Sequence, residues 1–117
     1  MLKLTEDTRI YVADKSVDCR KAINGLASLV LEQFEMPVND GSVYVFYNNS
    51  CDRIKCLFWD KNGFVLYHKR LERGRFKMSK TADGSYMITQ NQLDWLLAGL
   101  DFQLMNEFNR LDFTNYF

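Results

Sequence analysis

The chain has 117 residues, of which 47% are hydrophobic and 15% aromatic, and its formal net charge is zero. This length suits one domain, and the aromatic content together with the low net charge excludes an intrinsically disordered chain. Charge is unevenly spread, because residues 51–80 carry nine basic and three acidic side chains, while residues 1–50 and 81–117 carry net charges of −2 and −4. The middle of the chain is therefore a basic block, which points weakly to an anionic partner.

The three cysteines indicate a reducing compartment. Cys19, Cys51 and Cys56 are an odd number at irregular spacing, which makes a poor disulfide framework. The first residues have no apolar core of signal-peptide length, and no segment approaches the roughly 20 apolar residues that cross a bilayer. We therefore expect a cytoplasmic protein with free thiols and no membrane partner.

In chain order, the first predicted elements are a strand and a helix. Residues 9–13 are β-branched and aromatic, which favours a strand. Apolar residues then recur with helical spacing over 19–34. Ser16 or Asp18 is the expected N-cap, and the Met-Pro pair at 36–37 ends the helix.

A series of strands is predicted next. Their links are short and polar, which permits antiparallel neighbours, and the Asn-Gly pair at 62–63 is a hairpin signal. Thr89, with Gln92 three residues later, has the pattern of a capping box that begins a second helix, which Gly99 ends. The expected strands are 43–47, 54–59, 64–69, 75–78 and 86–88.

These elements predict an α+β fold, in which an antiparallel β-meander of about five to six strands packs against two helices. We expect a single domain over residues 1–117, with its core at about 9–102. The aromatic C-terminal tail, 103–117, is too apolar to be solvated, so it should dock on its own domain or on a partner.

Catalytic chemistry is sparse. His68 is the one histidine, so no Ser/His/Asp or Cys/His set can be assembled. The cysteine spacing does not suit zinc, no glycine-rich phosphate loop is present, and the carboxylates have no spacing typical of a metal site. We expect no enzyme activity, no metal, no cofactor and no small-molecule substrate.

The basic block predicts a cationic surface on a β-hairpin. A hairpin loop centred on residues 61–62, or shifted to 62–63, makes one face apolar near the turn and cationic at the far end. Like charges across a strand pair destabilise it, so this end would gain from an anion or from water. With the loop at 61–62, the expected pairs are Trp59 with Phe64, Leu57 with Leu66, Lys55 with His68 and Arg53 with Arg70.

Two interpretations of this surface stay open. It could contact nucleic-acid phosphates, with aromatic rings stacking on bases, or it could be a solvated face that prevents aggregation, with the rings in the core. Lys69 is expected on the opposite face of the hairpin. The candidate binding residues are Arg20, Lys21, Arg53, Lys55, Lys69, Arg70, Arg73 and Arg75, and the candidates for stacking are Trp59, Tyr67 and Phe76.

Several blocks of the sequence carry a resemblance to a known family. Residues 17–27 resemble a D-M-R-K-G-(aliphatic)-D-G-L-A pattern, and 52–60 a D-R-(aliphatic)-K-x-L-x-W-D pattern. Residues 69–76 resemble K-R-L-E-x-G-R-F, and 97–102 resemble L-x-G-(aliphatic)-D-(aromatic). In this order and spacing, they resemble the TnpB accessory proteins of insertion-sequence-66 transposons, which are distinct from the RNA-guided nuclease of the same name. Departures from the family pattern include Cys19, Ala22, Asn24 and Met78.

The resemblance implies a non-catalytic accessory role in transposition, beside a separate transposase of the same element. The resemblance assigns no catalytic or ligand-binding residues to this chain. The matching sequence blocks do contain most of the basic residues that are candidates for binding. Two hypotheses follow: the basic surface binds the DNA backbone, or the protein is an adaptor that docks on the transposase without contacting DNA.

Overall fold

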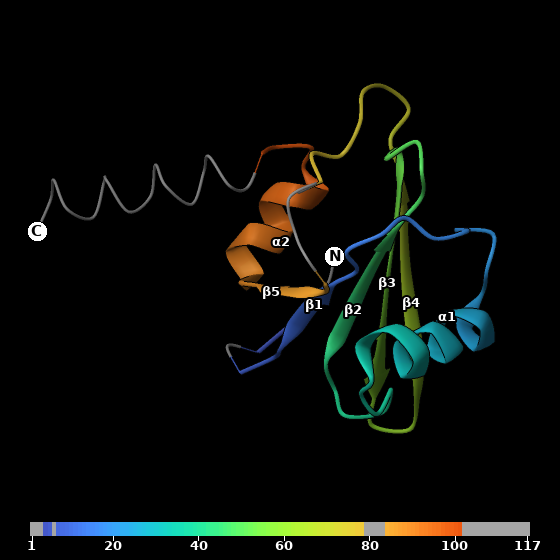
Figure 1. Ribbon diagram of the computed structural model, residues 1–117. Helices are drawn as coiled ribbons and strands as arrows, with labels where there is room; N and C mark the ends of the chain where they lie inside the picture. The colour runs from blue at the N-terminus through green and yellow to red at the C-terminus, as the bar shows by residue number, and fades with distance from the viewer. Residues whose placement is uncertain (1–3, 6, 79–83, 102–117) are drawn as a thin grey trace, which may run out of the picture.

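A five-stranded sheet forms the middle layer of the computed structural model, which describes residues 4–5, 7–78 and 84–101 (Figure 1). One helix lies on each face of the sheet. The strands are β1 (Ile10–Val12), β2 (Val43–Tyr47), β3 (Arg53–Asp60), β4 (Gly63–Arg70) and β5 (Tyr86–Ile88). The helices are α1 (Ile23–Leu29), which continues as a π-helical turn over Val30–Phe34, and α2 (Gln90–Leu97).

The predicted α+β class is confirmed, but the simple meander is not. The strand order is β4-β3-β2-β1-β5, and β2, β3 and β4 form an antiparallel meander. In contrast, β1 lies between β2 and β5 and pairs in parallel with β2. The segment between β1 and β2 contains α1, and a long crossover of this kind is what a parallel pair requires.

Two predicted element boundaries are wrong. No strand forms over residues 75–78, which belong to the loop that follows β4. The first helix begins at Ile23, and Ala22 is its N-cap, so neither Ser16 nor Asp18 caps it. The Asp18 carboxylate instead accepts from the backbone N–H of Arg20 and holds a turn ahead of the helix.

The second helix begins as predicted. The N–H of Gln92 donates to Thr89 Oγ1 at 3.1 Å, and the N–H of Thr89 donates to Gln92 Oε1 at 2.8 Å. This is a complete capping box, which satisfies two N–H groups at the helix start. Gly99 follows the helix with φ of +83°, a left-handed conformation that suits glycine.

Apolar side chains are buried on both faces of the sheet and belong to one hydrophobic core. On the α1 face, the Phe34 ring makes edge contacts with Tyr44 and Phe46, at centroid distances of 5.1 and 5.8 Å. Leu93 and Leu96 of α2 are buried as part of the same hydrophobic core. Within the described ranges, neither helix has the length and hydropathy needed to span a bilayer.

Candidate functional site

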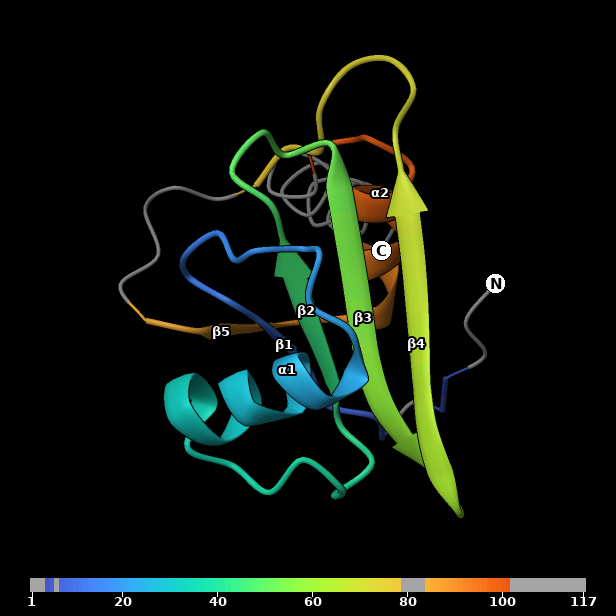
Figure 2. The same cartoon turned by 90° about the vertical axis from the view of Figure 1, so that its right-hand side faces the viewer.

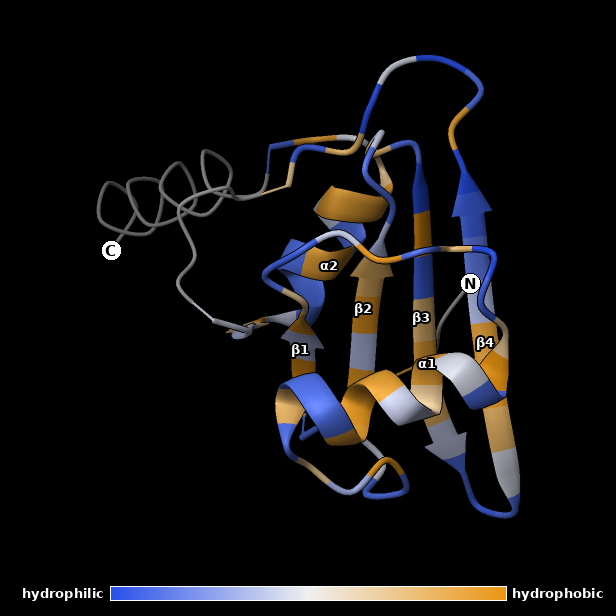
Figure 3. Ribbon diagram, turned by 45° about the vertical axis from the view of Figure 1, so that its right-hand side comes forward, coloured by the Kyte–Doolittle hydropathy of each residue, from blue (hydrophilic) through white to orange (hydrophobic). Residues whose placement is uncertain are grey.

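The cationic end of the β3–β4 hairpin forms as predicted. The hairpin has a two-residue loop at 61–62, and Arg53 lies opposite Arg70 and Lys55 opposite His68. Figure 3 shows hydrophilic residues at this end of both strands and hydrophobic residues towards their middle. The apolar part of the hairpin thus packs in the core, while the charged part lies where β3 begins and β4 ends.

Two of the predicted cations have internal roles. Lys55 is only 7% exposed, and its Nζ donates to the carbonyl oxygen of Lys21 at 2.8 Å, just ahead of α1. Lys69 points to the opposite face, as predicted, and its Nζ donates to the carbonyl oxygen of Leu97 at 2.7 Å, at the end of α2. Both ammonium groups therefore fasten a helix to the sheet.

Two arginines form ion pairs with carboxylates two residues away. Arg20 binds Asp18 at 2.9 Å, and Arg70 binds Glu72 at 3.0 Å. The hydrogen bonds from Arg20 lower the pKa of Asp18 to about 2. Because these pairs are exposed to water, they contribute little stability, but they do partly neutralise both guanidinium groups.

Arg53 lies on β3 opposite Arg70 and is half-buried. Its Nε atom is buried and has no hydrogen-bond partner in the described part of the chain. The pKa of the Asp52 carboxyl is lowered, first by the hydrogen bond from Asn48 and further by the charges of Arg53 and Arg70. Arg53 therefore adds positive charge to this end of the sheet, and none of the described carboxylates bonds to it directly.

The loop after β4 has the clearest architecture for binding. Its two ends are fastened to the β2–β3 turn, since the N–H of Leu71 donates to Asp52 O at 2.8 Å and that of Phe76 to Cys51 O at 2.7 Å. The Phe76 side chain is 2% exposed. Gly74 has φ of +78°, a left-handed conformation that allows a tight turn between Leu71 and Phe76. We call residues 71–77 the basic loop; Figure 2 shows it beyond the end of β4.

Three side chains of the basic loop are available to a partner. Arg73, Arg75 and Lys77 are exposed, and among the residues that the structure describes none of them has a hydrogen bond or an ion pair. Lys77 is outside the set of binding residues predicted from the sequence, although it continues the run of basic residues at every second position, after Arg73 and Arg75. Beside the loop is a hollow of about 290 Å³, lined by Asn49, Cys51, Arg75, Phe76, Lys77, Met78 and Asp101.

The three aromatic candidates do not gather at this loop. Trp59 lies at the other end of β3, where its ring makes an edge contact with Phe64 at 4.9 Å. Tyr67 is half-buried on the α2 face of β4. Phe76 is a core residue, which agrees with the alternative that its ring fills the core. The loop therefore offers charge rather than a stacking platform.

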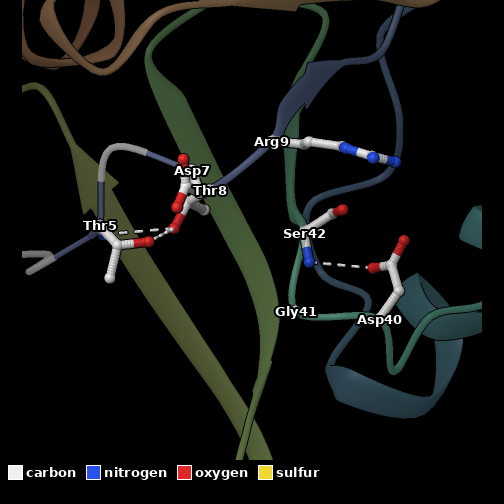
Figure 4. A pocket seen from close by; sticks show the side chains of 7 residues that line it. All are labelled: Thr5, Asp7, Thr8, Arg9, Asp40, Gly41 and Ser42. Atoms are coloured by element: carbon white, nitrogen blue, oxygen red, sulfur yellow. Dashed lines mark hydrogen bonds between the residues drawn. The ribbon is translucent and has the colours of Figure 1, made fainter.

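A further hollow, of about 400 Å³, lies near the starts of β1 and β2 (Figure 4). Its polar groups are largely engaged with each other: the hydroxyls of Thr5 and Thr8 are 2.9 Å apart, and Asp40 accepts from the N–H of Ser42 at 2.9 Å. None of the predicted binding residues lines it. In the described ranges, no three His, Cys, Asp or Glu side chains lie close enough to hold a metal ion.

The pKa of His68 should reflect the positive potential at the cationic end of the β3–β4 hairpin. Burial, and then the charges of Lys55, Arg53 and Arg70, lower the pKa of His68 below the ordinary value of 6.5. The unfolded chain therefore binds the proton more readily, and we expect stability to fall as the pH drops through 6.5. A ¹H NMR titration of the imidazole would measure this pKa, and denaturation of the His68→Gln variant across the same pH range is the control. A pKa at or above 6.5 would contradict this description of the potential.

Comparison with known proteins agrees with the resemblance seen in the sequence. Residues 8–107 match the family model of IS66 Orf2-like proteins. The chain is 36% identical over 101 residues to the uncharacterized protein y4jC of Sinorhizobium fredii (strain NBRC 101917 / NGR234), covering 86% of each chain. It is 33% identical over 103 residues to the uncharacterized protein y4hO of the same strain, covering 88% of this chain and 90% of the relative.

No solved structure matches the chain. The family match covers most of the described residues, including α1, the whole sheet and the basic loop. The family is not one known for catalysis. This chain belongs to the IS66 Orf2-like family, and its role is that of an accessory protein in insertion-sequence transposition.

Proposed function

We propose that this domain is a non-catalytic member of a transposition complex and binds the DNA backbone through the basic loop. The observation that carries the proposal is a loop fastened at both ends that exposes Arg73, Arg75 and Lys77 without internal partners in the described structure. Arg53 and Arg70 add charge at its base. Phosphate groups are the ligands that such a cluster attracts most strongly in DNA.

The fixed base of the loop favours binding. A mobile loop loses conformational entropy when it closes on a ligand, whereas a loop already ordered loses less. Here two backbone hydrogen bonds and the buried Phe76 ring order the loop in the free protein. We expect these cations to contact phosphate groups, and so to position the protein on DNA rather than to select a sequence.

The K-R-L-E-x-G-R-F block gives independent support. Most of its residues have an internal role here: Lys69 bonds to the end of α2, Glu72 pairs with Arg70, Gly74 makes the turn and Phe76 fills the core. Arg75 has no such role among the described residues. Its exposed guanidinium is therefore available to an anionic partner.

A salt titration tests the proposal. A fluorescent duplex should bind the full-length protein at low salt, and the logarithm of the binding constant should fall linearly with the logarithm of salt concentration. Three phosphate contacts predict a slope of about −3, since each contributes about −0.9. Absence of binding at low salt, or a slope near zero, would contradict DNA-backbone binding.

The adaptor hypothesis is the alternative outcome. If the duplex does not bind while the transposase of the same element co-purifies with the protein, the basic loop binds an acidic protein surface instead. The aromatic tail, 103–117, lies outside the described residues, so its predicted docking role remains a prediction. Deleting it and repeating the co-purification separates a tail-mediated contact from a loop-mediated one.

A further inference from the structure

One edge of the sheet is a long strand with apolar side chains on both faces. β4 is the outermost strand at its end of the order β4-β3-β2-β1-β5, and it runs for eight residues. Its central residues, Phe64, Val65, Leu66 and Tyr67, are all apolar and point alternately to the two faces. A strand that is apolar on both faces normally has both faces covered by other parts of a protein.

The usual protections of a sheet edge are missing from the middle of β4. Natural edge strands are short, or carry a proline, a bulge or a central lysine, which prevent pairing with another chain. β4 pairs with β3 without a bulge over all eight residues and contains no proline. Its charged residues stand at its C-terminal end, and Val65 in the middle is 37% exposed.

The opposite edge shows the contrast. β5 has only three residues, so it offers few free backbone groups. Along β4, every second residue directs its N–H and C=O away from β3, because hydrogen-bonded pairs alternate along an antiparallel ladder. In the described part of the chain, no backbone hydrogen bond reaches this outer edge of β4.

We propose that β4 pairs antiparallel with β4 of a second copy of this chain, which joins the two sheets into one. The sequence of the strand favours this occupant. Antiparallel pairing about Leu66 sets Leu66 against its own copy on one face and Val65 against Tyr67 on the other, so each face gains an apolar contact. Phe64 then lies opposite His68.

Charge selects the antiparallel arrangement over the parallel one. The basic end of β4, His68 to Arg70, would lie against itself in a parallel pair, and like charges across strands are destabilising. In the antiparallel pair each basic end meets the turn end of the other copy. The contact is then two-fold symmetric, with the same patch used by both copies, as in most homodimers.

Light scattering after size-exclusion chromatography tests the proposal on the full-length protein. We expect a mass of twice 13.8 kDa at micromolar concentration. Val65→Lys places a charge in the middle of the edge, and two-fold symmetry places a second one close to it, so this variant should have the mass of one chain. Met87→Lys is the matched control, because Met87 is 57% exposed on the opposite edge strand, and it should remain a dimer.

Amide hydrogen exchange locates the contact on the wild-type protein, so this test does not depend on whether the Val65→Lys variant folds. In the dimer, consecutive amides from Phe64 to Lys69 should be protected, whereas an open edge shows protection at alternate residues only. A wild-type protein with the mass of one chain overturns the proposal, even if these amides are protected, because another segment of the same chain would then cover the edge. A dimer with alternate protection also overturns it, since its interface lies elsewhere.

Discussion

Replacing Phe76 with alanine is expected to lower the free energy of unfolding by about 3 kcal/mol or more, the usual cost of removing a buried phenylalanine. The residue is 2% exposed and packs in the core although it belongs to a loop. Its backbone N–H also donates to Cys51 O at 2.7 Å, and we expect this bond to weaken when the ring is removed. Chemical denaturation measures the change directly.

The same variant should weaken DNA binding while every cation remains. Without its anchor the basic loop becomes mobile, so binding must also order it, which costs free energy. Phe34→Ala is the control, because Phe34 is also a buried ring but lies in the π-helical turn after α1, packed on Tyr44 and outside the basic loop. If Phe76→Ala kept wild-type stability and affinity, the loop would not be held in the way described.

Neutralising the basic loop is expected to remove most of the salt dependence of DNA binding. The variant combines Arg73→Gln, Arg75→Gln and Lys77→Gln, three exposed side chains without partners in the described structure. Since each phosphate contact contributes about one unit to the salt slope, the slope should become shallower by about three units. Fluorescence anisotropy over a range of salt concentrations gives this slope.

A matched variant separates the loop from net charge. Lys15→Gln, Arg20→Gln and Lys21→Gln remove three exposed cations from the segment before α1 and change the net charge equally. This variant should retain most of the slope, because Arg20 already pairs with Asp18 and the segment lies outside the loop. Equal losses in the two triple variants would mean that binding follows overall charge and that the loop has no special role.

The hairpin was predictable from the sequence because its pattern is local. Alternating side chains and a turn at residues 61–62 fix which residues face each other, so the pairing of Arg53 with Arg70 was expected and is found. The internal roles of Lys55 and Lys69 were not predictable. Each depends on a carbonyl group brought close by the packing of a helix, at Lys21 and Leu97, far away in the chain.

Other errors have equally physical causes. Residues 75–78 alternate charged and apolar, like a half-buried strand, but one buried aromatic residue anchoring a loop produces the same pattern. Asp18 has the chemistry of an N-cap, yet its carboxylate is engaged by Arg20, and the helix begins at Ile23, five residues after Asp18. In both segments, tertiary and neighbouring contacts override a local preference.

The most direct test of the account is to map the DNA contact on the protein by NMR. Titration of the ¹⁵N-labelled full-length chain with a short duplex should shift the backbone amides of residues 71–77 and the Nε–H of Arg73 and Arg75, with smaller changes at Arg53 and Arg70. Shifts confined to another surface, such as the segment before α1, or no shifts at low salt, would contradict binding through the basic loop.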